Sequence, residues 1–280
     1  MNKLLIVDGH NLLFQMFYGM PSRILNSQGR AIHGTLGFVG ALLKIIRMTE
    51  PTHAVVLFDG ECENERAEID ADYKANRPDF SEMEWEDVPF SQLPDVYAAL
   101  DCLEIKHTEM TDCEADDVVA SYAMRYGKDN RIVISSYDSD FFQLISDNVS
   151  ILRYRGDNTV ICDPVYLKNK LGVCAERYAD YKSLTGDSAD NIKGADKIGP
   201  NTAAQLVCEY GDIERIIKNA ESIKKTSVRE SVQRNAERLR KNYSLIKLTG
   251  KADIPFELSE LEYTPNGMTT SQVLTAIGIK

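Results

Sequence analysis

The sequence has few histidines and no closely paired cysteines, so it lacks the usual patterns of a zinc site. Four histidines stand apart along 280 residues, and the six cysteines contain no C-x-x-C pair. We interpret the cysteines as reduced packing residues of a reducing compartment. No G-x-G-x-x-G or G-x-x-x-x-G-K-[ST] motif follows an apolar run, which argues against a nucleotide cofactor.

Long apolar segments are also missing. The longest runs are about five residues, whereas a membrane-spanning helix needs about 20. The first run, residues 4–7, ends at Asp8 and is too short for the core of a signal peptide. With 43% hydrophobic and 27% charged residues, the composition is that of a globular protein. We therefore expect a cytoplasmic protein with no membrane partner.

Basic residues are outnumbered, and the net charge of −11 argues at first against a nucleic-acid partner. Nine of the acids, however, belong to the groups described below. If metal ions neutralised those nine, −11 plus 9 would leave −2. Net charge alone therefore does not decide the partner.

Three carboxylates crowd into four positions, at Glu114, Asp116 and Asp117. The apolar residues at 118–124 predict a helix, so these acids lie in its first turn, where the helix dipole tolerates negative charge. A plain acidic helix start is one explanation. The other is a bound multivalent cation, because close carboxylates repel unless water or a cation neutralises them.

Short apolar strands alternate with helices in the N-terminal part. This alternation predicts an α/β fold with a mostly parallel sheet and helices on both faces. The predicted helices are 35–48, 94–103 and the one after Glu114. The predicted strands are 4–7, 54–58, about 103–106, 131–135 and 149–154, the last forming a hairpin with 159–162.

Acids recur where these strands end. Asp8 and Asp59 end the first two strands, and Asp138 and Asp140 follow strand 131–135. Ligands of open α/β sheets bind beyond the carboxyl ends of the strands, so we expect these acids to meet there with the Glu114 group. Oxygen ligands without clustered His or Cys favour Mg²⁺ or Mn²⁺.

After about residue 164 the pattern becomes helical. Asp187 and Asp190 are three apart, so one helical turn would direct both toward a shared ion. Residues 198–203 predict a tight turn that opens a helix, with Pro200 near its first position. Its free N–H groups would suit a phosphate; an ordinary helix start is the alternative.

Six short motifs occur in the order and spacing of one nuclease family. They are V-D-G at 7–9, F-D at 58–59, Y-K-A-N-R-P at 73–78, E-A-D-D at 114–117, D-S-D at 138–140 and G-D-S-A-D-N at 186–191. Over about residues 3 to 250 the sequence resembles the bacterial 5′→3′ exonucleases, flap endonuclease-like 5′-nucleases also found as the N-terminal domain of DNA polymerase I. No polymerase domain follows, so we expect a free-standing relative.

The resemblance implies a resolvase-like (PIN-like) catalytic domain over 1–163, with a helical arch at about 70–95. It implies a helical DNA-binding region and C-terminal tail over 164–280, with a helix-three-turn-helix motif at about 183–215. Two sites for Mg²⁺ or Mn²⁺ are implied by the same motifs. The first would use Asp8, Asp59, Glu114, Asp116, Asp117 and Asp138, and the second Asp138, Asp140, Asp187 and Asp190.

By the same resemblance, Lys74 and Arg77 are catalytic residues that contact the scissile phosphate, and Tyr73 stacks on the terminal base. Without the motif, a solvated helix face would explain both cations. The implied duplex-binding turn contains Lys197, Gly199, Asn201 and Thr202.

Two features depart from the family. Lys197 stands where relatives usually carry glycine, which puts in question both the duplex contact and the K⁺ ion that this turn binds in relatives. The arch is acidic around Trp85, with Glu82, Glu84, Glu86 and Asp87. Basic residues gather later, as a phosphate-facing surface or a solvated helix, at Lys224, Lys225, Arg229, Arg234, Arg238, Arg240 and Lys241.

We therefore expect a two-metal phosphodiesterase that cleaves DNA at 5′ ends, flaps or junctions in replication and repair. Two alternatives stay open. One is a PIN-type ribonuclease, against which the helical DNA-binding region argues. The other is a non-catalytic protein that binds DNA junctions, against which the complete carboxylate set argues.

Overall fold

The computed structural model describes residues 1–60, 65–77 and 79–280. Cys62, expected to be a packing residue, and Pro78, part of the Y-K-A-N-R-P motif, lie outside the described residues. Four of the described cysteines, Cys102, Cys162, Cys174 and Cys208, are free thiols. Among the described residues, no helix is both long and apolar enough to cross a membrane.

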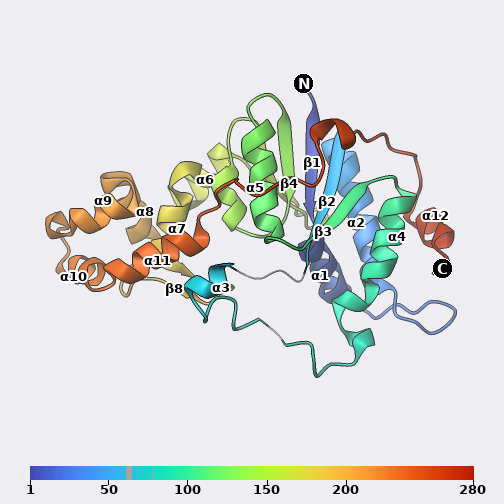
Figure 1. Cartoon of the computed structure of the whole chain (residues 1–280), viewed down its shortest axis with the longest axis horizontal. Coiled ribbons are helices and arrows are strands. Elements are labelled where there is room, and N and C mark those ends of the chain that lie inside the picture. The colour runs from blue at the N-terminus through green and yellow to red at the C-terminus, as the bar shows by residue number, and fades with distance from the viewer. Residues whose placement is uncertain (61–64, 78) are drawn as a thin grey trace.

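A six-stranded sheet forms the centre of the N-terminal part (Figure 1). Its spatial order is β3-β2-β1-β4-β5-β6; β1 to β5 pair in parallel, and β6 is antiparallel to β5. The mostly parallel sheet predicted from the sequence is confirmed. The strands are β1 (Lys3–Asp8), β2 (His53–Asp59), β3 (Lys106–Met110), β4 (Arg131–Ser135), β5 (Val149–Arg153) and β6 (Val160–Cys162).

The strand order reverses at the centre of this sheet. The chain adds β2 and β3 on one side of β1, then crosses to its other side to form β4 and β5. Such a reversal opens a crevice outside the carboxyl ends of the two central strands, where open α/β sheets bind their ligands. The carboxyl ends of β1 and β4 therefore mark the expected site.

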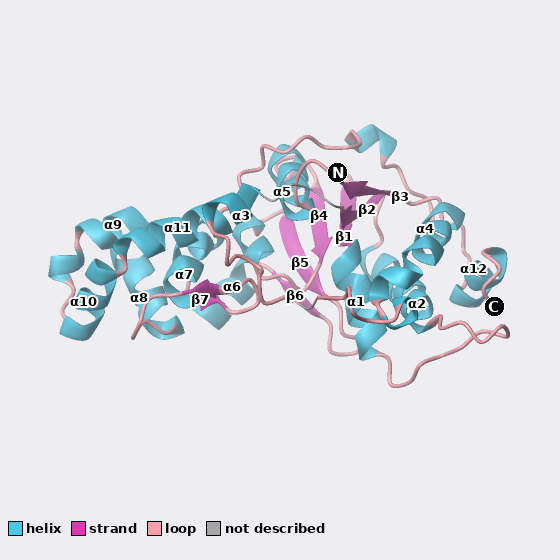
Figure 2. Cartoon of the chain, turned by 60° about the horizontal axis from the view of Figure 1, so that its bottom comes forward, coloured by secondary structure: helices cyan, strands magenta, loops and turns pink. Residues whose placement is uncertain are grey.

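Two apolar cores cover the two faces of the sheet. Leu4 and Ile6 of β1 pack in one core with helix α5, while Leu5 and Val7 pack in the other with α1, α2 and α4. All four side chains are at most 1% exposed, as expected for a strand buried on both faces. Figure 2 shows the helices on either side. They are α1 (Gly9–Gly19), α2 (His33–Thr49), α4 (Leu93–Cys102) and α5 (Ala115–Tyr126).

Two sequence predictions were incomplete here. Helix α1 was not predicted, because its start at Gly9-His10-Asn11 combines residues of low helix propensity. Strand β3 was predicted near 103–106 but begins at Lys106. A turn precedes it, in which Glu104 takes a left-handed conformation with φ 57°. The predicted hairpin of β5 and β6 is confirmed.

The segment expected to form a helical arch is mostly non-helical. After the short helix α3 (Glu65–Ile69), the described residues up to 92 form turns and two 3₁₀ segments, Trp85–Asp87 and Pro89–Gln92. Asp70 and Asp79 accept hydrogen bonds from backbone N–H groups two residues later. Such side-chain bonds favour turns over helix.

A helical region extends the molecule beyond the sheet (Figure 1). Its apolar residues are continuous with the α5 core, so the two parts share one interior. Its elements are α6 (Pro164–Leu171), α7 (Tyr178–Thr185), β7 (Gly186–Asp187), β8 (Ile192–Lys193), α8 (Pro200–Tyr210), α9 (Ile213–Lys218), α10 (Thr226–Arg234) and α11 (Ala236–Ile246), with 3₁₀ turns at Ala175–Arg177 and Ala220–Ser222.

The C-terminal tail returns to the N-terminal part. The Tyr122 hydroxyl donates to the carbonyl of Phe256 at 2.8 Å, and Ala54 N–H donates to the carbonyl of Leu261 at 3.0 Å. After the 3₁₀ turn Leu258–Glu260, helix α12 (Thr270–Ala276) packs against α2 and α4. The tail therefore buries apolar surface on the α/β part.

Gly9 is needed for close packing at the start of α1. A Cβ atom there would overlap the ring of Phe58, whereas one at Gly19, at the other end of α1, would meet nothing within 4 Å. We expect Gly9→Ala to lower stability by about 1–3 kcal/mol. Gly19→Ala should be neutral or stabilising by up to ~1 kcal/mol. Urea unfolding of both variants checks this, and equal effects would contradict it.

Candidate metal centre

Five carboxylates line a cleft of about 830 Å³ at the carboxyl edge of the sheet, and one of them is Glu109 of β3. The other four are acids predicted as metal ligands: Asp8 at the end of β1, Asp59 at the end of β2, Asp116 in the first turn of α5, and Asp138 after β4. Of the acids expected at strand ends, Asp8, Asp59 and Asp138 line this cleft, whereas Asp140 belongs to a second group described below. Asp116 joins the three from the start of α5, as expected.

Hydrogen bonds at helix starts hold Asp8 and Asp59 in place. Asp8 caps α1 by accepting from Asn11 N–H at 3.0 Å, and it accepts from the Ser136 hydroxyl at 2.8 Å. Asp59 accepts from Ala115 N–H, at the start of α5, at 2.8 Å. These bonds fix the carboxylates at the helix starts, where the helix dipoles favour negative charge.

Two of the cleft carboxylates, Asp8 and Asp116, are nevertheless destabilised as anions. Desolvation is the main cause and nearby acids add to it, raising the pKa of Asp8 to about 7 and that of Asp116 well above its usual range. No lysine or arginine nitrogen within the described chain lies within 4 Å of Asp8, Asp59, Asp116 or Asp138. The cleft therefore holds negative charge that an added cation would stabilise.

The remaining acids of the Glu114 group are already paired. Glu114 contacts Arg66, and its other oxygen is 2.7 Å from the Lys74 Nζ; Asp117 is 2.9 Å from Arg66. Burial opposes ionisation of Glu114, but Lys74 and Arg66 together lower its pKa. In this structure the six acids expected at the first site therefore form two groups, one open to the cleft and one paired with cations.

Lys74 and Arg77 line the same cleft as the four open carboxylates. Lys74 has a left-handed backbone, with φ 58°, and its N–H donates to the carbonyl of Asp190 at 3.0 Å. Arg77 is 3.2 Å from a carboxylate oxygen of Asp190. A strained residue of this kind persists where surrounding contacts hold it, often at functional sites.

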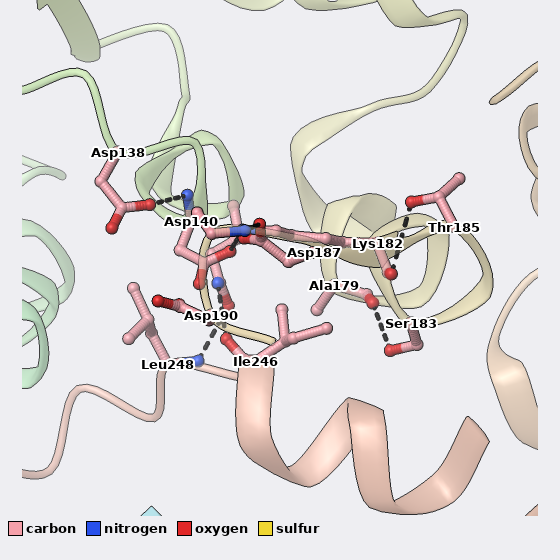
Figure 3. A network of polar contacts seen from close by, with 12 residues as sticks. Asp138, Asp140, Ala179, Lys182, Ser183, Thr185, Asp187, Asp190, Ile246 and Leu248 are labelled. Atoms are coloured by element: carbon pink, nitrogen blue, oxygen red, sulfur yellow. Dashed lines mark hydrogen bonds and ion pairs between the residues drawn. The ribbon is translucent and has the colours of Figure 1, made fainter. Parts of the chain in front are cut away.

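The second group of acids forms a compact cluster (Figure 3). Asp140, Asp187 and Asp190 each offer an oxygen, and these oxygens lie within 4.8 Å of one another. Asp187 and Asp190 meet through the β7–β8 hairpin, not through the helical turn expected from their spacing, because Asp187 accepts from Ala189 N–H at 2.8 Å and closes a tight turn.

The donors of this cluster fit a hard divalent cation, because all of them are carboxylate oxygens. The chain also places a positive charge there, since Lys182 contacts both Asp140 and Asp187. Burial, with Asp138 nearby, raises the pKa of Asp140 to about 7 despite Lys182, whereas Lys182 lowers that of Asp187 against the effect of burial.

Tyr73 is buried in this structure. The residue is 8% exposed and packs with Ala179, Ile192 and Leu245, while the Lys74 Nζ lies 4.9 Å from the centre of its ring. The observed role of the ring is to pack the segment before Lys74 against the helical region. Stacking on a terminal base stays a prediction.

The expected duplex-binding turn keeps a glycine-like backbone without the glycine. Lys197 has φ 65°, the left-handed conformation that glycine adopts most easily. Gly199 and Pro200 then open α8 as expected. Lys197, Gly199 and Asn201 are exposed and Thr202 is partly exposed, so all four remain accessible.

The acidic arch has a partner that sequence reasoning did not find. Arg23, in the loop after α1, is 3.3 Å from Glu86 and 2.6 Å from Asp87. These exposed pairs tie the arch to that loop, although each contributes little stability. They account for two of the four arch acids; the structure gives no reason for Glu82 and Glu84.

Sequence reasoning also missed Arg66, Lys182 and His10. Arg66 and Lys182 carry no motif, and only the fold brings them to the acids. His10 does have a signal, because it directly follows Asp8-Gly9; its Nδ1 accepts from Asp59 N–H at 3.2 Å within the cleft.

Asp116 is the best position for testing the repulsion in the cleft. Asp116→Asn removes one of the crowded charges, so in EDTA it should raise stability by about 1–2 kcal/mol, a few degrees in Tm. The same variant should gain less from Mg²⁺ than the wild type. Calorimetry with and without Mg²⁺ checks this, with Asp147→Asn at an exposed acid as the control. A lower Tm in EDTA would mean that Asp116 supports the fold directly.

Comparison with known proteins identifies the family. The family model described as the 5′-3′ exonuclease N-terminal resolvase-like domain matches residues 3–172, and that described as the 5′-3′ exonuclease C-terminal SAM fold matches residues 173–269. The resolvase-like sheet domain and following helical region expected from the motifs are thereby confirmed.

Sequence similarity to individual proteins supports the same family. A 5′-3′ exonuclease of Aquifex aeolicus is 33% identical over 262 residues, which are 93% of this chain and 86% of the relative. DNA polymerase I of Thermus filiformis is 35% identical over 259 residues, 91% of this chain, but the match spans only 29% of the polymerase.

Among solved structures, the flap endonuclease of bacteriophage T5, in a complex with DNA and metal ions, has a similar fold. Its TM-score is 0.73 at 22% identity, covering 88% of this chain and 89% of the T5 protein. The family models cover nearly the whole chain, and the motifs that predicted the resemblance lie within them. The chain belongs to the 5′-3′ exonuclease family.

Proposed function

We propose that this chain is a divalent-metal-dependent 5′-nuclease that cleaves DNA at 5′ ends, flaps or junctions in replication and repair. One observation carries the proposal: carboxylates from five separate segments line a single cleft together with Lys74 and Arg77. Crowded acids facing two cations suit the binding of metal ions and a phosphodiester in one place.

The proposed metal ligands are Asp8, Asp59, Asp116 and Asp138 for a first cation, with Glu114 and Asp117 beside them. For a second cation they are Asp140, Asp187 and Asp190 next to Asp138. Carboxylate oxygens suit Mg²⁺ or Mn²⁺. A pair of such cations, when bound, would supply an activated water and stabilise charge on the attacking and leaving oxygens.

The chain itself supplies positive charge for the phosphate. Lys74 and Arg77 are paired with Glu114 and Asp190, so both ammonium and guanidinium groups already lie at the cleft. A phosphodiester bound there would offer them a competing anion. Charge that develops on its non-bridging oxygens would then be stabilised by groups already in position.

We propose that the helical region holds the duplex. Among the late basic residues, Arg240 pairs with Glu214 and Glu237, and Lys241 pairs with Asp70. Lys224, Lys225 and Arg234 are exposed, and we assign phosphate contacts to them. The turn of Lys197, Gly199, Asn201 and Thr202 would contact the duplex backbone, with or without K⁺.

Several expectations stay predictions. These are the division between residues 163 and 164, the helix-three-turn-helix motif at about 183–215, the arch at about 70–95, the role of Tyr73 and the cytoplasmic location. The helix–turn–helix order of α7, the 186–199 segment and α8 supports the second of these.

A cleavage assay tests the function. The chain should cut a 5′-flap DNA with Mg²⁺ or Mn²⁺ and be inactive in EDTA. Single-stranded RNA of the same length should be cut far more slowly. Faster cleavage of the RNA would favour the ribonuclease, and flap binding without cleavage at any Mg²⁺ or Mn²⁺ concentration would favour the non-catalytic junction binder.

A comparison of Lys74→Ala with Arg234→Ala separates chemistry from binding. Lys74→Ala should bind flap DNA almost normally in Ca²⁺ but cleave it at saturation about 10²-fold more slowly, because it removes charge that acts on the transition state. Arg234→Ala should weaken binding and lower the salt dependence by about one unit of slope, with normal saturated cleavage.

The two readouts are affinity by anisotropy and single-turnover rate at saturating enzyme. If Lys74→Ala lost affinity in proportion to activity while its saturated rate stayed normal, Lys74 would be an ordinary phosphate anchor. The catalytic charge would then have to come from Arg77 or from the metal ions.

A further inference from the structure

One lysine differs from all others in the described chain. Lys182, in α7, is 4% exposed, and no other described lysine or arginine is buried. Its ammonium contacts Asp140, at the start of the 3₁₀ helix Asp140–Leu144, and Asp187, in β7 (Figure 3). A buried ammonium is costly unless it is paired, so these two carboxylates are what keep Lys182 charged in the interior.

The position of this ammonium coincides with the second carboxylate cluster. Asp140, Asp187 and Asp190 have oxygens within 4.8 Å of one another, and Lys182 occupies two of the three. Asp190 is 3.2 Å from Arg77. Each carboxylate of this cluster therefore has a cation supplied by the chain.

The first cluster lacks this compensation. Asp8, Asp59, Asp116 and Asp138 have no lysine or arginine within 4 Å in the part of the chain that the structure describes. A divalent cation entering there meets uncompensated negative charge. A divalent cation entering the second cluster must displace the Lys182 ammonium or lie close beside it, and like charges at such short range repel strongly.

We propose that Lys182 is a built-in counter-ion of the second cluster that makes this cluster bind a divalent cation much more weakly than the first. The inference rests on the proposed function, since it concerns the same metal centre. Lys182 also holds Asp140 and Asp187 together when no metal is bound, which connects α7 and the β7–β8 hairpin to the sheet domain. It is thus a positioning residue for the second site.

The test is Mn²⁺ binding to the full chain without DNA, followed by the electron paramagnetic resonance of free Mn²⁺. The wild type should bind one ion tightly and a second weakly. In Lys182→Met, the second dissociation constant should fall by about tenfold or more, the effect expected when a charge at this distance is removed. Lys170→Met, the same change at an exposed lysine of α6, should leave both constants unchanged.

Two further measurements test whether the tighter second Mn²⁺ is bound at the second cluster and whether Lys182 has only a structural role. Adding Asp187→Asn to Lys182→Met should abolish the tightened second site and leave the first. In thermal unfolding with EDTA, Lys182→Met should have a lower Tm than the wild type, because Asp140 and Asp187 then repel each other without the ammonium. Adding Mn²⁺ should restore the Tm of this variant. If Lys182→Met were unstable and Mn²⁺ did not restore it, Lys182 would be a structural ion pair only, and the proposal would be wrong.

The outcomes separate this proposal from the proposed function. An unchanged or weaker second site in Lys182→Met, with the first site intact, would overturn only the role of Lys182. A wild type that binds no Mn²⁺ at the first cluster would overturn the metal-dependent function as well.

Discussion

The repulsion among carboxylates gathered at one edge of the sheet is the constraint on which the rest of this structure depends. Desolvation strengthens this repulsion, as the raised pKa values of Asp8 and Asp140 indicate. The cations of the chain neutralise only some of these carboxylates. Four cations of the chain, Arg66, Lys74, Arg77 and Lys182, form ion pairs with Glu114, Asp117, Asp140, Asp187 and Asp190. Asp8, Asp59, Asp116 and Asp138 in the cleft have no such partner within the described residues. The charge left in the cleft is what makes it suitable for a cation.

The same contacts connect the two parts of the molecule. Lys74 N–H donates to the carbonyl of Asp190, and the Asn76 side chain donates to the carbonyl of Ser188 at 2.8 Å. The beginning of the arch segment is therefore bound to the β7–β8 hairpin of the helical region. Within the sheet domain, Asp59 connects β2 to α5, because its carboxylate accepts a hydrogen bond from the first N–H of α5. Groups proposed for chemistry thus also set the relative positions of the elements that carry them.

Much of the fold was predictable because its signals are local. Strands buried on both faces give short continuous apolar runs, so β1, β2 and β4 were found almost to the residue. The acids at their ends followed from the geometry of parallel sheets, and the ordered motifs identified the family.

Some features were missed because contacts distant in sequence decide them, and others because local side-chain hydrogen bonds favour turns over helix. Nothing local shows that Lys182 meets Asp140, or that Tyr73 is buried against Leu245. The arch was expected to be helical from the resemblance, yet Asp70 and Asp79 direct their hydrogen bonds into turns. Asp187 and Asp190 were expected to meet on a helical turn and meet through a hairpin.

The most direct test of the account is a crystal structure of the protein grown with Mn²⁺, with the ions located by their anomalous scattering. The account predicts a strong peak in the cleft among Asp8, Asp59, Asp116 and Asp138. A cleft with no peak at saturating Mn²⁺, or a strong peak only at acids outside the cleft, would contradict it.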